Sequence, residues 1–220
     1  MAGDKLFQKR RAQRAEEARR VAVERKEKRR FLIVCEGETE EAYFQYYADR
    51  QPDLITEITS NCGTSPMCVT SHAVNLARKD GDFDEVFAIF DGDTTDIKNF
   101  ERAILMAKNS SEVSAIHSTP CFEYWLMLHF SFSRKPFVGI KNAKSAGTQI
   151  LSELKTCPGM ESYTKGEKLN FPSFVGRIET AIENSKTALS QAINEQQRNP
   201  STLIHQVISA IRGEEEEDIT

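Results

Sequence analysis

The sequence lacks the motifs of several common enzyme classes. It has no GxxxxGK[ST] phosphate loop, no GxGxxG dinucleotide fingerprint, no HExxH zinc pair and no GxSxG nucleophile elbow. Each of these chemistries depends on its own spacing of glycines, ligands or nucleophile. The four histidines are scattered and show no zinc-site spacing. A self-contained NTPase or a dinucleotide-dependent enzyme is therefore not expected.

Cysteine pairs and long apolar runs are also missing. The five cysteines form no CxxC pair and their number is odd, which argues against a disulfide framework and against a zinc ribbon. Cys35 and Cys121 border apolar runs, so we expect them to act as small buried hydrophobes. No apolar stretch approaches the roughly 18 residues of a membrane span, and no apolar segment follows the basic N-terminus as in a secretion signal. We expect a cytoplasmic protein with no membrane contact.

Charge is unevenly distributed along the 220 residues. Residues 1–30 hold 12 Lys and Arg against 5 Asp and Glu, a net charge of +7, whereas the rest carries a net −11. Residues 5–29 contain no Gly or Pro and predict one long helix, with few large apolar side chains. Such a basic helical arm is either solvated or binds nucleic-acid phosphates. An acidic tail follows at residues 213–220.

Apolar runs alternate with helical patterns through residue 130. We predict strands over residues 31–35, 54–59, 86–90 and 113–117, with helices over 67–79, 97–108 and 122–130 between or after them. Short continuous apolar runs are typical of buried parallel strands. The chain then predicts helices over 141–156, 171–194 and 201–212. We expect an α/β protein with a parallel sheet and flanking helices over 31–135, and a helical part over 136–212 that packs on it.

Acidic residues directly follow two of the predicted strands. Glu36 follows the first, and the sequence Asp91-Gly92-Asp93 ends the third. Ligands bind at the carboxyl ends of parallel strands, so these carboxylates meet if the strands are neighbours. Because adjacent carboxylates repel one another, a cation would be needed to neutralise their charge. Oxygen ligands suit Mg²⁺ or Mn²⁺. A DGD sequence alone is also common turn chemistry, so the prediction of a metal site rests on both signals together.

Several stretches carry a resemblance to a known family. A strand ending in Glu36-Gly37 and a later strand ending in Asp91-x-Asp93 resemble the Toprim domain of primases, topoisomerases and OLD-type nucleases. The stretches FLIVCEGETEEAYF, VFAIFDGD, STPCFEYWLMLHF, YTKGEK and NPSTLIH resemble successive landmarks of the RloB-like, AbiLii-related family. The resemblance covers about residues 30–211. It implies a Toprim-like fold in a bacterial phage-defence protein encoded beside an ATPase.

The resemblance also implies roles for individual acids. Glu36 matches the Toprim glutamate, and Asp91 and Asp93 match the metal-binding aspartates. Glu123 matches a position that either supplies a further acidic ligand or satisfies backbone N–H groups at the start of a helix.

Other matched residues have two readings. Tyr163 and Lys165 match the YxKG element, where the lysine either neutralises a scissile phosphate or the pair fixes a loop. Asn199 and Ser201 match NPST, for which we favour a helix cap. Thr119 departs from the family, since many members have asparagine there, and leaves the role of that loop open.

The resemblance implies an Mg²⁺-dependent nuclease that cuts nucleic acid, RNA or tRNA more readily than DNA, with an ABC- or AAA-type ATPase as partner. In that mechanism Asp91 and Asp93 hold the ion, and Glu36 binds it through water or takes a proton from the attacking water. Self-association is left open. Two rivals are a non-catalytic Toprim-like module that binds nucleic acid or the ATPase, and a primase-like nucleotidyl transferase. The second lacks any visible zinc module for a template.

Overall fold

A five-stranded sheet forms the centre of the protein in the computed structural model. The structure describes residues 10, 11, 13, 14, 16, 17, 28–92, 96–139, 145–165 and 171–214. The strand order is β2-β1-β3-β4-β5, in which the first four strands run parallel and the last is antiparallel to β4. The strands are β1 (Arg29–Cys35), β2 (Leu54–Thr59), β3 (Glu85–Asp91), β4 (Ser114–Thr119) and β5 (Ser201–Thr202). The α/β fold with a mostly parallel sheet is Toprim-like, as expected.

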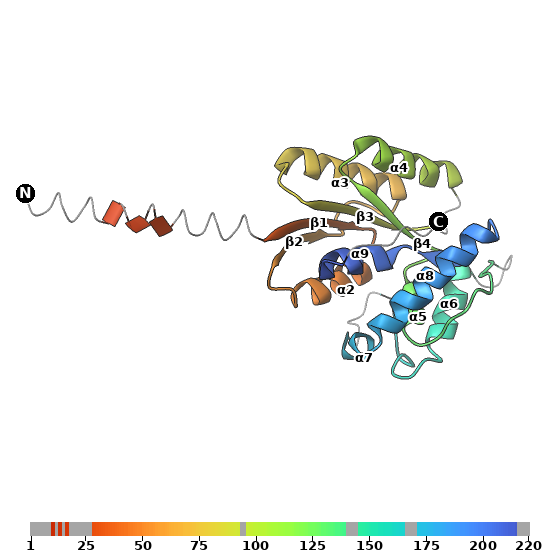
Figure 1. Cartoon of the computed structure of the whole chain (residues 1–220). Helices are drawn as coiled ribbons and strands as arrows, with labels where there is room; N and C mark the ends of the chain where they lie inside the picture. Colours follow the sequence, from red (N-terminus) through yellow and green to blue (C-terminus); the bar gives the residue numbers. More distant parts are fainter. Residues whose placement is uncertain are drawn as a thin grey trace, which may run out of the picture.

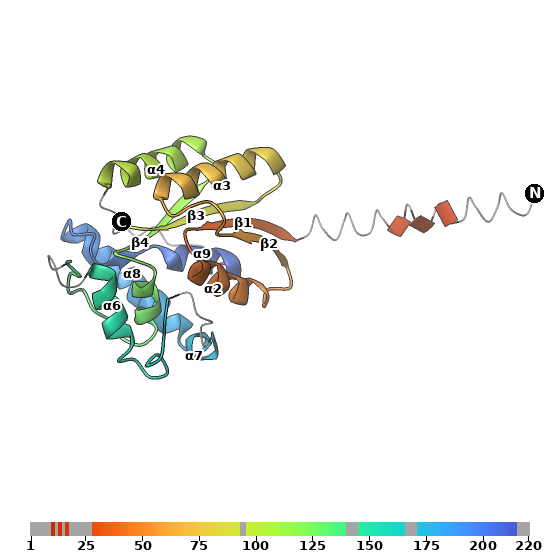
Figure 2. The ribbon, with the colours of Figure 1, turned by 180° about the vertical axis from the view of Figure 1, so that it is seen from behind.

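Helices cover both faces of the sheet. They are α2 (Glu38–Ala48), α3 (Pro66–Asp80), α4 (Ile97–Ser110), α5 (Glu123–Leu128), α6 (Ala146–Leu154), α7 (Phe171–Val175), α8 (Ile178–Asn194) and α9 (Ile204–Arg212). Helices α3 and α4 lie on one face, and the others lie on the opposite face (Figures 1 and 2). None of the described helices is long and apolar enough to cross a membrane.

Alternate residues of the central strands enter two separate cores. In β1, Leu32 and Val34 join the core under α3 and α4, while Phe31 and Ile33 join the core on the other face. A parallel strand covered on both faces needs apolar residues at every position. This requirement explains why the strand is a continuous apolar run and shows no alternation of polar residues.

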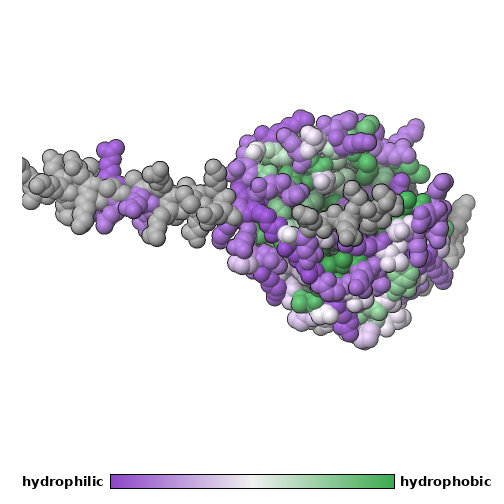
Figure 3. Space-filling view, viewed as in Figure 1, coloured by the Kyte–Doolittle hydropathy of each residue, from purple (hydrophilic) through white to green (hydrophobic). Residues whose placement is uncertain are grey.

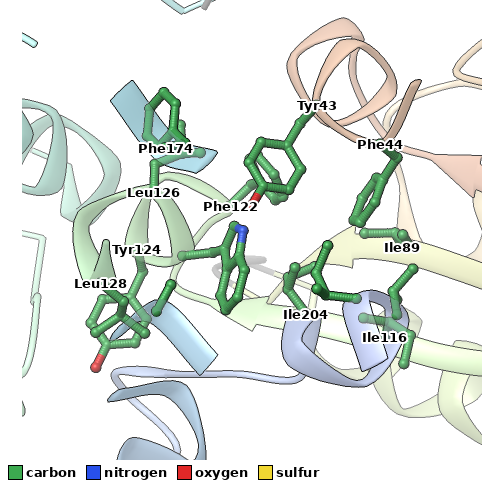
Figure 4. Packing of buried hydrophobic residues seen from close by; sticks show 14 of the residues in the cluster. Tyr43, Phe44, Ile89, Ile116, Phe122, Tyr124, Leu126, Leu128, Phe174 and Ile204 are labelled. Carbon is green, nitrogen blue, oxygen red and sulfur yellow. The ribbon is translucent and has the colours of Figure 1, made fainter. Parts of the chain in front are cut away.

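The larger core is built around aromatic rings. Tyr43 of α2 packs edge to face on Phe122, with 5.4 Å between ring centroids (Figure 4). The Tyr43 hydroxyl lies 3.1 Å from Nε2 of His129, whose Nδ1 lies 3.0 Å from the carbonyl oxygen of Trp125. Burial lowers the pKa of His129 to about 4. This histidine is therefore a neutral, fully bonded core residue.

The outer surface is mainly hydrophilic. Figure 3 shows one face of the molecule on which polar side chains surround smaller hydrophobic areas. The most exposed large apolar side chains in the described part are Ile97 and Val138, at 65% and 63% exposure. Scattered residues of this kind are normal on a protein surface.

The start and end of the folded core are tied together by Arg29. Its guanidinium donates hydrogen bonds to the carbonyl oxygens of Ala210 and Ile211 at the end of α9, the second at 2.8 Å. Arg29 therefore already belongs to β1, although the sequence predicted helix through this residue and an arm extending to residue 30. Of that arm, the structure describes only residues 10, 11, 13, 14, 16 and 17, all helical, and the bend at Lys28.

The C-terminal part contains a strand that the sequence did not predict. Residues 201–212 were expected to be helical throughout, but Ser201 and Thr202 form β5, and α9 begins only at Ile204. A hydrogen bond of 2.7 Å between the hydroxyls of Ser118 and Thr202 joins β4 to β5. The predicted cap at residues 199 and 201 is therefore wrong. The Asn199 side chain instead bonds the backbone N and O of residue 137.

The remaining helices differ from prediction mainly at their ends. The helix predicted over 171–194 is two helices, because the chain turns at residues 176–177 between α7 and α8. The helix predicted over 141–156 appears as α6, and residues 140–144 lie outside the described part. Helix α5 stops at Leu128, two residues earlier than predicted.

Candidate functional site

Two predicted site residues meet at the carboxyl ends of neighbouring strands. In the β1–β3 pairing Cys35 lies beside Ile89, and the Glu36 amide donates to the Ile89 carbonyl oxygen at 3.0 Å. The Asp91 amide in turn donates to Glu36 Oε2 at 3.0 Å. Burial, the largest influence, raises the pKa of Glu36, although this hydrogen bond opposes the rise. The structure therefore places Glu36 and Asp91 together; the prediction also included Asp93.

Asp91 is held by backbone and by charge. Its Oδ1 accepts a hydrogen bond of 2.9 Å from the Phe122 amide, and its Oδ2 lies 3.8 Å from Nζ of Lys165. Burial and the neighbouring Glu40 raise the pKa of Asp91 well above its usual range, while Lys165 opposes the rise. The charged form of this carboxylate is therefore disfavoured by loss of water and by like charge, and a nearby cation stabilises it.

Glu123 and Lys165 form the second half of the site. Glu123 opens α5, is only 1% exposed, and places Oε1 3.4 Å from Lys165 Nζ. That oxygen is buried and has no hydrogen-bond partner among the described residues. Burial lowers the pKa of Lys165, but Glu123 and Asp91 raise it more, so the net shift is upward. The lysine therefore stays charged between two acids.

The loop that carries Lys165 is anchored by Tyr163. The tyrosine is 7% exposed and packs in the larger core, and its amide donates to the Met160 carbonyl oxygen at 3.0 Å. Of the two roles considered for this element, the structure shows the tyrosine anchored in the core, and it places the lysine beside Asp91 and Glu123.

A further acid, Glu40, lies in the site and was not singled out from the sequence. It is 3% exposed, and its Oε2 is buried without a hydrogen-bond partner in the described part of the chain. Burial first, and then the charges of Glu123 and Glu36, raise its pKa to about 7, against the opposing effects of its own backbone amide and Lys165. The sequence carries no signal that separates Glu40 from Glu38 and Glu41, the other acids in the first turn of α2.

The two glycines of the acidic motifs lie against side chains of the site. A Cβ on Gly37 would lie 2.9 Å from Oε2 of Glu40, the end of a flexible side chain, whereas a Cβ on Gly92 would collide with the Thr119 hydroxyl and lie 3.2 Å from the backbone oxygen of Ser118. The Thr119 hydroxyl is buried and lacks a hydrogen-bond partner within the described ranges. Thr119, the residue that departs from the family pattern, therefore lies against Gly92. Asp93, the remaining predicted ligand, lies outside the described residues.

The arrangement is an oxygen-rich, partly desolvated cluster. Among the described residues, the carboxylates of Glu36, Glu40, Asp91 and Glu123 are accompanied by the amine of Lys165. In the part of the chain that the structure describes, no three His, Cys, Asp or Glu side chains are placed to share one ion. The donor chemistry nevertheless suits a hard divalent cation, because two carboxylate oxygens are buried without hydrogen bonds and three acids have raised pKa values.

The family profile described as RloB-like protein matches residues 31–211. The chain belongs to the RloB-like family. No curated protein and no solved structure matches it.

In this RloB-like protein the matched region contains every described residue of the carboxylate cluster. It begins within β1, two residues after Arg29, and ends in α9 at Ile211. The residues 10, 11, 13, 14, 16 and 17 of the arm lie outside the match. The site thus lies within the region that the family profile matches, and the arm lies outside that region.

Proposed function

We propose that this RloB-like protein is a metal-dependent nuclease. The observation that supports the proposal most directly is the buried carboxylate cluster at the carboxyl ends of β1 and β3, with one lysine facing it. Glu36 and Asp91 would hold the ion, together with Asp93 as expected from the sequence. When bound, a divalent cation polarises a phosphodiester and stabilises charge on the leaving oxygen.

The protein's own residues suit the other tasks of phosphodiester hydrolysis. Lys165 carries a positive charge that can neutralise a non-bridging phosphate oxygen. Glu40 has a pKa of about 7, close to the value at which a carboxylate accepts a proton from water efficiently at neutral pH. Glu123 holds the lysine in place through their 3.4 Å ion pair.

The substrate and partner follow from the family resemblance and from charge. We propose RNA, and tRNA in particular, ahead of DNA, in a cytoplasmic anti-phage role. A nuclease without a visible gate would be toxic, so an ABC- or AAA-type ATPase is proposed to restrain or deliver it. A homo-oligomer is compatible with the same role.

The alternative function is a non-catalytic Toprim-like module that binds nucleic acid or the ATPase. Such a module would have no use for four converging carboxylates, whose desolvation and mutual repulsion destabilise the fold. The raised pKa values of Glu40 and Asp91 therefore favour the nuclease. Clusters of this kind are more common at functional sites than elsewhere.

The test is cleavage of bulk tRNA, single-stranded DNA and plasmid by the full chain in Mg²⁺, Mn²⁺ or EDTA. Asp91→Asn keeps an oxygen for the Phe122 amide but removes the charge, and we expect it to reduce cleavage by at least ~100-fold. Asp53→Asn, at an exposed turn, is the matched control and should leave the rate unchanged. Full activity of Asp91→Asn, or cleavage that persists in EDTA, would contradict the proposal.

A further inference from the structure

We propose that Cys62 and Cys68 form a redox-sensitive pair, which a hydroperoxide converts into a disulfide beside the carboxylate cluster. Cys62 lies in the connection between β2, which ends at Thr59, and α3, which begins at Pro66, and Cys68 lies in the first turn of α3. Both are free thiols in the structure, Cys62 half-buried and Cys68 exposed. Formation of the disulfide is independent of the proposed nuclease function.

The two residues are close enough for a turn of the backbone to join them. A Cβ placed on Gly63, the residue after Cys62, would lie 3.6 Å from the Cβ of Cys68 and 3.7 Å from its sulfur. The two Cβ atoms of a disulfide lie about 3.5 to 4.5 Å apart. The Cys62 thiol must therefore shift by one residue along the chain to reach bonding distance. Gly63 has φ of 91° and no side chain, so the backbone can turn there with little steric hindrance.

In the reduced protein the Cys62 thiol is bonded to the neighbouring strand. It donates a hydrogen bond of 3.4 Å to the carbonyl oxygen of Cys35, the last residue of β1. Glu36, one of the acids proposed to hold the ion, follows directly in the chain. A disulfide to Cys68 would take this donor away from the backbone that carries Glu36. The oxidation state of the pair therefore acts on the position of a site residue.

The two thiols differ in their access to solvent and in their charge. Cys68 is exposed, so a peroxide can reach its sulfur directly. Burial raises the pKa of the Cys62 thiol and the neighbouring Cys68 raises it further, so Cys62 is protonated at neutral pH. Cysteines that sense oxidants combine an accessible sulfur with a second cysteine that resolves the product. We therefore assign the first attack to Cys68 and the second to Cys62.

The reaction consumes one molecule of hydrogen peroxide for each pair. The Cys68 sulfur attacks one peroxide oxygen, the O–O bond breaks, and the other oxygen leaves as water with the thiol proton. The Cys62 sulfur then attacks the sulfenic acid on Cys68, the S–O bond breaks, and a second water leaves with the Cys62 proton. Two thiols are oxidised to one disulfide, and the peroxide is reduced by two electrons.

The experiment uses a single tryptic peptide, because residues 51–78 contain both cysteines and no lysine or arginine before their last residue. The full chain is reduced, treated with hydrogen peroxide in EDTA, alkylated with N-ethylmaleimide in denaturant and digested. We expect the peptide from treated protein to lose two hydrogen atoms and to take up no maleimide, whereas the peptide from untreated protein takes up two. Cys35, Cys121 and Cys157 are buried and should remain thiols that the maleimide modifies.

Serine variants test the order of the two steps. In Cys62→Ser the sulfenic acid should persist on Cys68, where dimedone traps it, and in Cys68→Ser the Cys62 thiol should remain reduced. Cys157→Ser is the control and should form the same disulfide as the wild type. Two unchanged thiols after peroxide treatment, or a disulfide that joins Cys62 to Cys35, would overturn the proposed pair.

The effect on the site rests on the proposed function and is measured separately. After removal of peroxide, the oxidised wild type should cleave tRNA roughly tenfold more slowly, the scale for loss of an outer-shell partner of a metal ligand. Dithiothreitol should restore the rate, and Cys68→Ser should be insensitive to peroxide. An unchanged rate in the disulfide form would overturn the effect on the site.

Failure of the pair and failure of the nuclease function give different results. A disulfide that forms in a protein without any metal-dependent cleavage would leave the pair standing and remove the proposed function. Cleavage that depends on Asp91, by a protein whose two thiols resist peroxide, would do the reverse.

Discussion

The perturbation that tests the carboxylate cluster most directly is Glu40→Gln. The substitution keeps the size of the side chain and removes the charge whose pKa rises to about 7 from an ordinary value of 4.5. A raised pKa means that the folded protein prefers the protonated form. The contribution of Glu40 to stability is therefore fully present below pH 4.5 and is lost as the pH rises through about 7.

The size of the effect follows from the shift. At 1.36 kcal/mol per pKa unit, a rise from 4.5 to about 7 corresponds to roughly 3 kcal/mol of destabilisation at pH 8. Glutamine cannot ionise, so Glu40→Gln should be more stable than the wild type by up to roughly 3 kcal/mol at pH 8 and equal to it near pH 4. Part of this gain in stability comes from the neighbouring acids, because the charge of Glu40 no longer repels their carboxylates.

The assay is urea unfolding of the metal-free full chain in EDTA, from pH 4.5 to 8. Glu38→Gln is the matched control, since Glu38 is in the same turn of α2 but exposed. It should change the free energy of unfolding by no more than about 0.5 kcal/mol. Mg²⁺ should stabilise the wild type more than Glu40→Gln, because loss of a carboxylate charge weakens cation binding and the added stability rises with the logarithm of the affinity.

One result would refute the reasoning outright. If Glu40→Gln is no more stable than the wild type at pH 8, while the Glu38→Gln control behaves as expected, the carboxylate is not desolvated in the way that its burial indicates.

Three further predictions concern the charge of Lys165, the contact between the start of β1 and the end of α9, and the residue that ends α4. Lys165→Met should lower the stability of the metal-free protein at pH 8, because Asp91 loses its neighbouring cation, and equilibrium unfolding in Mg²⁺ should show a smaller loss than in EDTA. Arg29→Met should cost about 1 to 3 kcal/mol, since it leaves two carbonyl oxygens at the end of α9 without their donor, and hydrogen exchange at α9 should quicken. Ser111→Gly should raise the melting temperature by a few degrees relative to Ser111→Ala, because residue 111 has φ of 54° and a left-handed residue with a Cβ costs roughly 1 kcal/mol.

Strands β1 and β3 were predictable because residues 31–35 and 86–90 are short continuous apolar runs bounded by charged residues, which is typical of parallel strands buried on both faces. Strand β2 was predictable because apolar and polar residues alternate over 54–59. Strand β5 was not predictable in the same way, since Ser201 and Thr202 carry no apolar pattern. Their pairing depends on hydroxyl contacts with β4, which are distant in sequence. Local propensity for a helix start was overridden by tertiary contact.

The site was predictable where an acid directly follows a strand, as for Glu36 and Asp91. Glu40 was not singled out because a glutamate in the first turn of a helix is favoured there by the helix dipole even when exposed. Residues far along the chain act on its charge, since Glu123 raises its pKa and Lys165 lowers it. Only the folded arrangement shows that these side chains share one space.

The parallel course of β1 has a consequence for substrate length. The strand runs from Arg29, at the amino ends of the parallel strands, to Cys35, at their carboxyl ends beside the carboxylates. This is a span of about 20 Å at roughly 3.3 Å per residue. The chain before residue 28 therefore joins the core at the amino ends of the strands, opposite the carboxylates. If the basic arm binds phosphates from that attachment point, its footprint and the cut are separated by about six base pairs when the substrate is B-form DNA, at about 3.4 Å each. Duplexes shorter than this would reach only one of the two. The length of the shortest duplex whose cleavage depends on the arm thus measures the distance between the arm's attachment point and the carboxylates. Cleavage of still shorter duplexes should be insensitive to removal of residues 1–27.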